Sequence, residues 1–146
     1  MSRRIVLCMI MKNEAAVIER CLAAAAPLVD AVSLCDTGSD DGTPELAEAF
    51  LSAAEIPFRI SRHAWVNFGH NRSLSFTAAR DLARDLGWDL EQAWTLFLDA
   101  DMVIEAAEDF SAEQLYADSH QVRLGNADFW YYLSVLARLA LDWHSV

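Results

Sequence analysis

Two aspartates one residue apart, Asp99 and Asp101, come directly after the apolar run 95–98. Carboxylate oxygens suit a hard divalent cation such as Mg²⁺ or Mn²⁺, and such a cation can hold a diphosphate and stabilise it as a leaving group. A solvated loop produces the same spacing, so the pair alone is a weak signal. Its position favours a metal site, because the run before it is typical of a buried strand. Open α/β sheets bind ligands at the carboxyl ends of their strands.

Polar residues also follow two other apolar runs. Asn13 and Glu14 come after the run 5–11, and Asp36 comes after the run 31–35. In a parallel sheet these strand ends meet at one edge, so the three polar clusters together favour a site more than any one motif does. Simpler explanations stay open, since Asn13 also fits a helix cap and Asp36 also fits a turn-forming residue.

Strands and helices alternate along the chain. The pattern predicts strands at 5–11, 31–35, 58–61 and 93–98, and helices at 15–26, 44–54 and 70–86. Asn13 and Thr43 are the expected caps of the first two helices, and Ser111 with Gln114 is a capping-box signature for a short helix. The tail is β-like at 120–124 and 129–136. Repeated β-α-β units predict an α/β fold, a mostly parallel sheet flanked by helices.

Composition limits the class of protein. The 146 residues are enough for one domain with a real core, and 54% of them are apolar, which argues against disorder. A net charge of −11 disfavours binding to nucleic acid. No apolar run is long enough to predict a membrane span. The three cysteines form no Cys-x-x-Cys pair, so we expect buried, reduced thiols and a cytoplasmic location.

Three segments together resemble a known family. Residues 9–15 (MIMKNEA), 35–43 (CDTGSDDGT) and 96–102 (LFLDADM) stand in the order and spacing of family-2 glycosyltransferases with the GT-A (Rossmann-like) fold. The resemblance covers about residues 4–105 and is strongest to the bacterial branch with K-N-E and D-T-G-S-x-D-G-T motifs. It implies transfer of a sugar from a UDP- or GDP-linked nucleotide-sugar donor to an acceptor, assisted by Mn²⁺ or Mg²⁺ and usually with inversion.

The resemblance also implies roles for the residues after the first two strands. In the family these residues line the nucleotide pocket, which makes Asn13, Glu14 and Asp36 the expected donor-binding residues. Many members carry a second acid after the one at position 36, and that acid contacts the base. Thr37 occupies that position in this chain. It is therefore an expected donor-binding residue that offers a hydroxyl where those members have a carboxylate.

The remaining implied roles concern the diphosphate. The resemblance places Asp99 near the ribose and sugar and Asp101 on the metal ion. It makes both aspartates expected metal ligands. Arg72 belongs to an Asn-Arg pair, and a guanidinium there would match phosphate geometry. An ordinary arginine on a helix surface explains Arg72 equally well.

The family's general base has no assignable counterpart. Residues 138–146 resemble the segment that precedes a Gly-Val-x-His-Glu stretch, and acceptor-side residues commonly lie in that later part. We therefore expect residues 1–146 to be a single donor-binding GT-A-type domain without the family's C-terminal acceptor part. Exposed apolar surface near 130–141 would then favour a homo-oligomer.

Two other functions stay open. One is a non-catalytic nucleotide-sugar-binding or assembly domain. The other is a haloacid-dehalogenase-type phosphotransferase, because residues 97–103 also fit its D-x-D-x-V pattern. That family needs a lysine later in the chain, whereas Lys12 is the only lysine. A dinucleotide-binding domain is disfavoured, since no G-x-G-x-x-G follows the first expected strand.

Overall fold

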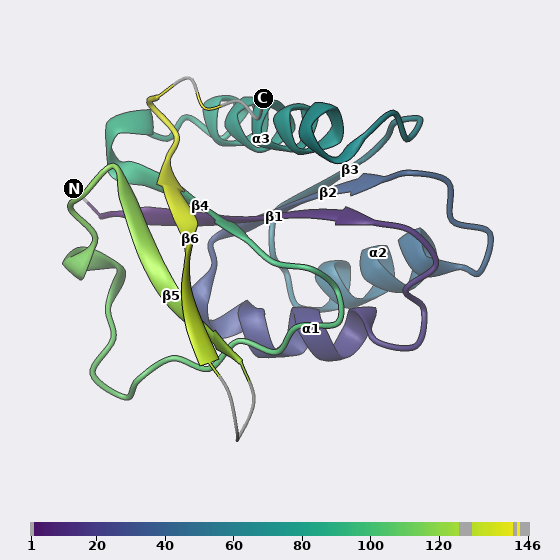
Figure 1. The fold of residues 1–146 in the computed structure, drawn as a ribbon, viewed down its shortest axis with the longest axis horizontal. Helices are drawn as coiled ribbons and strands as arrows, with labels where there is room; N and C mark the ends of the chain where they lie inside the picture. Colours follow the sequence, from purple (N-terminus) through teal and green to yellow (C-terminus); the bar gives the residue numbers. More distant parts are fainter. Residues whose placement is uncertain (1, 126–129, 142, 144–146) are drawn as a thin grey trace.

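The computed structural model describes residues 2–125, 130–141 and 143. Within this part of the chain, one six-stranded sheet has the strand order β3-β2-β1-β4-β6-β5 (Figure 1). The strands are β1 (Arg4–Met11), β2 (Ala31–Asp36), β3 (Phe58–Arg62), β4 (Ala93–Phe97), β5 (Ser119–Gly125) and β6 (Trp130–Arg138). Strands β3, β2, β1 and β4 are parallel, whereas β6 is antiparallel to both β4 and β5. The predicted mostly parallel α/β fold is therefore confirmed.

Helices cover both faces of the sheet. Helices α1 and α2 lie on one face and α3 lies on the other (Figure 1). Their bounds are α1 (Ile18–Ala25), α2 (Thr43–Ala53) and α3 (Phe68–Asp85), with 3-10 turns η1 (Ala26–Leu28), η2 (Leu90–Gln92) and η3 (Ala112–Gln114). The capping box predicted at Ser111 and Gln114 is confirmed at the start of η3. The β-like tail is also confirmed, as β5 and β6, although residue 129 lies outside the described residues.

The strand β1 is buried from both sides, which explains its continuous apolar run. Leu7 and Met9 belong to the core cluster under α1 and α2, whereas Val6 and Cys8 belong to the cluster under α3. Successive side chains of a strand point to opposite faces, so both faces of a fully covered strand need apolar residues. Complete burial of one such aliphatic side chain stabilises the fold by about 1.5–3 kcal/mol.

The connections create a switch point at β1. Helices α1 and α2 carry the chain outward through β2 to β3, and α3 then carries it back across the opposite face to β4. The register aligns the strand ends, because Met11 lies beside Asp36 and Asp36 lies beside Arg62. Ligands of open α/β sheets bind where the strand order reverses, outside the carboxyl ends of the strands. Here that place lies between the loops after β1 and β4.

The prediction that Asn13 caps the first helix is wrong. Helix α1 begins at Ile18, and its cap residue Val17 makes no side-chain capping bond. Asn13 has a left-handed backbone (φ 53), which asparagine tolerates better than most residues. The Glu14 carbonyl instead accepts the backbone N–H groups of Val17 (3.0 Å) and Ile18 (2.9 Å). The residues after β1 therefore form a loop and a turn, which free the Asn13 side chain for other contacts.

The cap of α2 also differs by one residue from the prediction. Gly42 is the cap, in a left-handed conformation (φ 87) that favours glycine, and Thr43 is the first helical residue. The proline is at the helix start, as expected.

The cysteine prediction is confirmed for the thiols themselves. Cys8, Cys21 and Cys35 are buried and free. Among the described residues there is also no helix with the length and apolar character needed to cross a bilayer.

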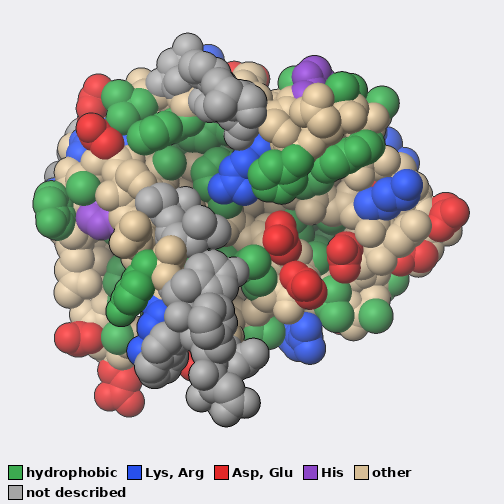
Figure 2. Space-filling view, in the orientation of Figure 1, with side chains coloured by type: hydrophobic (Ala, Val, Ile, Leu, Met, Phe, Trp, Pro, Cys, Tyr) green, Lys and Arg blue, Asp and Glu red, His purple; other side chains and the backbone are tan. Residues whose placement is uncertain are grey.

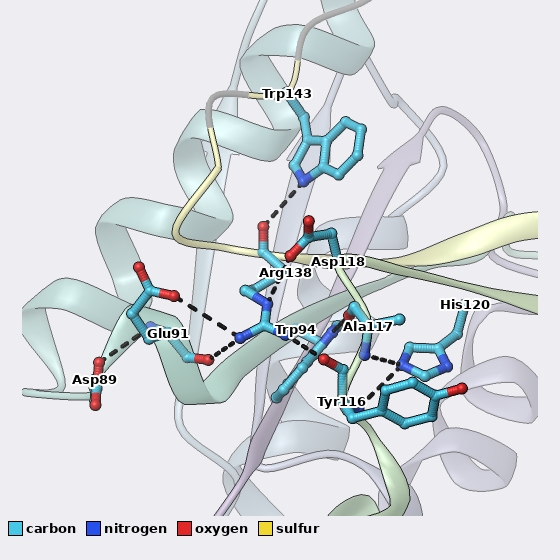
Figure 3. A network of polar contacts seen from close by, with 9 residues as sticks. All are labelled: Asp89, Glu91, Trp94, Tyr116, Ala117, Asp118, His120, Arg138 and Trp143. Atoms are coloured by element: carbon cyan, nitrogen blue, oxygen red, sulfur yellow. Dashed lines mark hydrogen bonds and ion pairs between the residues drawn. The ribbon is translucent and has the colours of Figure 1, made fainter.

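A polar network fixes the turn that leads into β5 (Figure 3). The Arg138 guanidinium on β6 lies over the Trp94 ring, 4.8 Å from its centroid. It donates to the carbonyls of Glu91 (2.9 Å) and Tyr116 and pairs with the Asp118 carboxylate (3.1 Å). One arginine thus joins β6, the start of β4 and the turn before β5.

His120 on β5 completes this network. Its Nε2 accepts the backbone N–H groups of Tyr116 (3.2 Å) and Ala117 (3.1 Å) (Figure 3). A nitrogen that accepts hydrogen bonds carries no proton, so this ring is neutral with its proton on Nδ1. Burial first and the charge of Arg138 second lower the pKa of His120 from its usual 6.5. Protonation would remove the only acceptor that Nε2 offers to the two N–H groups.

We predict that His120 makes the stability of the fold depend on pH. Because its folded pKa is lowered, its contribution is complete above 6.5 and is lost as pH falls toward the folded value. Denaturant unfolding from about pH 8 to about pH 5 should show His120→Gln losing less stability on acidification than wild type. The exposed His70→Gln is the control and should follow wild type. Parallel curves for His120→Gln and wild type would contradict the prediction.

Candidate functional site

The loop after β1 is bonded to the loop after β2. The backbone N–H of Asn13 donates to Ser39 Oγ (2.9 Å), and Asn13 Oδ1 accepts the N–H of Asp40 (2.9 Å). Asn13 was predicted from the sequence to be a donor-binding residue. In the structure, its side-chain oxygen joins the first two motifs, which leaves its amide nitrogen for other partners.

A second set of bonds continues this contact to the start of α2. Thr43 Oγ1 accepts the Glu14 N–H (2.8 Å) and donates to Asp41 Oδ1 (2.5 Å), while Asp41 Oδ2 accepts the Ala15 N–H (3.1 Å). The hydrogen bond from Thr43 is the main reason why the pKa of Asp41 lies below its usual range. Thr43 is fully buried, so its hydroxyl joins both loops away from solvent. Together these bonds define an interlock of Asn13, Glu14, Ser39, Asp41 and Thr43.

Asp36 closes the turn after β2. Its side chain is buried and accepts the Ser39 hydroxyl (2.5 Å) and the N–H groups of Ser39 (3.0 Å) and Gly38 (3.2 Å). Gly38 has a φ of 121, which favours glycine. The turn-forming role considered for Asp36 is therefore real, and a ligand would meet a carboxylate that the turn already holds in place.

A shallow hollow lies beside this turn. Its volume is about 270 Å³, and it is lined by Asp36, Thr37, Gly38, Arg62, His63 and Ala64. Thr37 is held by its backbone N–H (3.0 Å) and its hydroxyl (3.3 Å), which both donate to the Met11 carbonyl. The hollow therefore joins the ends of β2 and β3, and the two acids after β4 are not part of its lining.

The acids form a group on the other side of β1. Asp99 and Asp101 are exposed and follow β4, and Glu14 is half-buried after β1. Burial first, and then the charges of Asp101, Asp99 and Asp41, raise the pKa of Glu14. Figure 2 shows acidic side chains gathered on the face where β1 and β4 end. This group is a region of negative potential that a cation would relieve.

Arg72 lies beside the end of β4. Its guanidinium is 4.2 Å from the centroid of the Phe97 ring and 5.6 Å from that of Phe68. Stacking on two rings holds the planar group in one orientation and leaves its N–H groups in the plane for other partners. Two aromatic rings therefore hold the Arg72 guanidinium beside β4, and its binding to phosphate remains a prediction.

Asn71, the other member of the Asn-Arg pair, has a different function that sequence reasoning missed. Its side chain is buried, donates to the Ala64 carbonyl (3.1 Å) and accepts the Val66 N–H (2.9 Å). These bonds hold the loop between β3 and α3, where Trp65 and Val66 are exposed. The loop that contributes Ala64 to the hollow is thus tied to the helix that carries Arg72.

Comparison with known proteins identifies the family. The family model for glycosyl transferase family 2 matches residues 6–120, and the chain belongs to this family. A TPR repeat-containing protein of Synechococcus elongatus is 34% identical over 102 residues, which are 68% of this chain and 21% of that protein. The resemblance read from the three motifs is thereby confirmed.

Solved structures agree on the fold. S. aureus TarS residues 1–349 in complex with UDP gives a TM-score of 0.51 at 18% identity, covering 67% of this chain and 27% of that chain. A second structure of TarS residues 1–349 gives the same values. This likeness establishes the GT-A arrangement of the sheet and helices. The chain spans about a fifth of the Synechococcus relative and about a quarter of the TarS fragment.

These comparisons leave no support for the phosphotransferase alternative. The two aspartates follow β4, the fourth strand along the chain, whereas the haloacid-dehalogenase pattern belongs on the first core strand. The structure gathers Glu14, Asp99 and Asp101, and it places Asp36 and Thr37 at the hollow. Their roles toward a ligand remain predictions.

We predict that the buried hydroxyl of Thr43 carries much of the stability of the interlock. Thr43→Val keeps the shape but leaves the Glu14 N–H without its acceptor and removes one of the two donors of Asp41 Oδ1, whose bond from the backbone N–H of residue 43 remains. The free energy of unfolding should fall by about 1–3 kcal/mol, measured by denaturant titration. Thr77→Val, at an exposed position of α3, should change it by less than about 0.5 kcal/mol. Equal effects of the two substitutions would show that the interlock does not depend on Thr43.

Proposed function

We propose that this chain is the donor-binding domain of a glycosyltransferase, and that a nucleotide-sugar lies along the carboxyl edge of its parallel strands. The observation that carries the proposal is the convergence of three motifs on the switch point beside β1. Membership of glycosyl transferase family 2 over residues 6–120 supports it. The interlock supports it too, because it holds the first two motifs in one fixed relation.

The acids after β4 would hold the diphosphate through a divalent cation. Asp101, together with Asp99, offers the oxygen ligands that Mn²⁺ and Mg²⁺ accept. In the described part of the chain, no three His, Cys, Asp or Glu side chains are close enough together to bind a metal by themselves. The donor's diphosphate and water would supply the other ligands. When bound, the cation neutralises the charge that develops on the departing nucleoside diphosphate.

The hollow beside Asp36 would take the nucleoside. Thr37 lines it with a hydroxyl in place of a second acid, and Arg62 and His63 add donors from the end of β3. Carbonyl oxygens and ring nitrogens of a base can accept from such donors. The TarS structure of the same fold was determined with UDP, so uridine is the first nucleoside to test, with guanosine as the alternative.

Asn13 and Glu14 complete the proposed donor site between the hollow and the acids. The Asn13 side-chain oxygen accepts the Asp40 N–H, which leaves its amide nitrogen for a ligand, and Glu14 is half-buried in the same loop. Glu14 lies close enough to Asp99 and Asp101 for their charges to raise its pKa. A cation bound to the acids would therefore also stabilise the charged form of Glu14.

Transfer itself would be a direct displacement. The acceptor oxygen bonds to the anomeric carbon as the bond from that carbon to the diphosphate oxygen breaks, and a carboxylate base takes the hydroxyl proton. This sequence of bonds inverts the anomeric centre. The base and the residues that would recognise the acceptor are left unassigned.

A non-catalytic nucleotide-sugar-binding domain is the second candidate. It stays a candidate because no general base is assigned among the described residues. Both candidates bind the donor, so donor hydrolysis or transfer by this chain separates them. A cytoplasmic location agrees with the buried free thiols. Self-association through the exposed Tyr132 and Leu141 remains a prediction, which light scattering would test.

We predict that UDP binding depends on a divalent cation and on Asp101. Titration calorimetry with UDP and GDP, each with and without Mn²⁺, should show binding of one nucleotide only when the cation is present. Asp101→Asn should weaken it by at least roughly tenfold, or about 1.4 kcal/mol. Asp81→Asn on α3, which removes an acid paired with Arg84, is the control and should bind like wild type. Binding that ignores both Mn²⁺ and Asp101→Asn would contradict the proposal.

We also predict that Arg72 binds phosphate and not the nucleoside. Among the described residues, none forms a hydrogen bond with the Arg72 guanidinium, although two rings hold it in place. Arg72→Gln should therefore weaken UDP by roughly tenfold and leave the weaker affinity for uridine unchanged. The measurement is the ratio of the two dissociation constants. An equal loss for UDP and uridine would show that Arg72 acts on the fold or on the nucleoside.

A further inference from the structure

Two consecutive residues of α1 contact the backbone of the acid pair. The Cys21 thiol donates to the carbonyl of Asp99 (3.7 Å), and the Arg20 guanidinium donates to the carbonyl of Asp101 (3.3 Å). Neither residue contacts a carboxylate in these bonds. The carboxylates of Asp99 and Asp101 stay exposed to solvent, while α1 holds the backbone that carries them.

We propose that Arg20 and Cys21 are positioning residues that set where Asp99 and Asp101 present their carboxylates to a cation-bound diphosphate. The inference rests on the proposed function and adds two residues outside the three motifs. It assigns α1 a role beyond covering the sheet.

The acid segment needs such support because the sheet ends before it. The last hydrogen bond that continues the pairing of β4 with β1 joins the Leu98 N–H to the Cys8 carbonyl (3.3 Å). A turn follows, in which the Met102 N–H donates to the Asp99 carbonyl (3.0 Å). Between the two acids only Ala100 is buried. Two like charges so close together repel each other, so the segment has a reason to spread unless its backbone is held.

Cys21 is a suitable donor for this purpose. Its side chain is fully buried, and its Sγ lies 3.7 Å from the Asp99 carbonyl oxygen. A thiol in apolar surroundings favours its protonated form, which can donate to that carbonyl. A thiol is a weak donor, and here it is the second partner of the Asp99 carbonyl, which also accepts the Met102 N–H (3.0 Å).

Arg20 has two opposing effects on a cation. Its hydrogen bond to the Asp101 carbonyl holds the acid in place, whereas its positive charge lies near the place where the cation would bind. Removing the whole side chain changes both effects at once. A protonated thiol carries no charge, so Cys21 separates the effect of position from the effect of charge.

The position of α1 also links the first motif to the third. The helix follows immediately on the turn in which the Glu14 carbonyl accepts from Val17 and Ile18. It is anchored on the sheet by buried side chains, including Ile18 and Leu22. A displacement of α1 would therefore move Glu14 and the acid pair together. Glu14, Asp99 and Asp101 are therefore all linked to α1.

The test measures Mn²⁺–UDP affinity together with amide hydrogen exchange of residues 98–102 in the ligand-free protein. The variants are Cys21→Ala, Arg20→Met, which keeps the apolar stem, and Arg20→Gln, which keeps a donor without the charge. Arg84→Met, at a helix-surface arginine on α3 paired with Asp81, is the matched control. Melting temperatures and circular dichroism establish that each variant is folded.

Cys21→Ala and Arg20→Met should both weaken Mn²⁺–UDP by up to roughly tenfold and speed exchange in residues 98–102. Arg20→Gln should lose less than Arg20→Met, and the control should match wild type in both readouts. If Cys21→Ala does not fold, the exposed Arg20 pair still gives the comparison.

Two kinds of result would overturn the inference: those that exclude the positioning role alone, and one that excludes the proposed function as well. Affinity within twofold of wild type for Cys21→Ala and Arg20→Met, or unchanged exchange, overturns the positioning role alone. Tighter binding by both Arg20 variants would have the same meaning, because charge repulsion would then outweigh position. Absence of Mn²⁺–UDP binding by wild type overturns the proposed function, and the positioning role with it.

Discussion

The contact between the loops after β1 and β2 is the constraint on which the rest of the site depends. The buried Thr43 hydroxyl accepts the Glu14 N–H and donates to Asp41. Asn13 bonds the loop after β2 through its own backbone N–H and its own side-chain oxygen. Polar groups removed from water must find partners, so neither loop can move without breaking bonds in the other. The hollow at the end of β2 and Glu14 in the loop after β1 are therefore held in one fixed relation.

The second motif serves the fold as much as it serves a ligand. Asp36 accepts three hydrogen bonds within its own turn, and Asp41 accepts from the start of α2 and from the first loop. This dual use explains why the motif reads as turn chemistry and as a site signature at once. A carboxylate already held by donors is also preorganised for binding, because it has no conformational entropy left to lose.

The fold could be predicted from the sequence because burial on both faces leaves a clear record. The run 5–11 has apolar residues at successive positions, and β1 has helices over both faces. The edge at which the motifs meet followed from parallel topology alone. The start of α1 could not be predicted, since Asn13 satisfies the same local rule as a helix cap. Only the neighbouring loop, distant in sequence, decides that its oxygen accepts from Asp40.

The residues that hold backbone segments in place were the ones that the sequence did not predict. His120, Arg20 and Cys21 lie outside the three motifs, and Asn71 was noted only as the neighbour of Arg72. Each of these four side chains bonds a backbone group outside its own helix or strand. Only the three-dimensional structure reveals these contacts. The central claim is that one ligand lies across the switch point, and a crystal structure of the chain with UDP and Mn²⁺ tests it most directly. The account predicts one UDP with its base in the hollow at Asp36 and its diphosphate beside Asp101. A UDP bound away from this edge, or a cation bound without contact to Asp99 or Asp101, would contradict it.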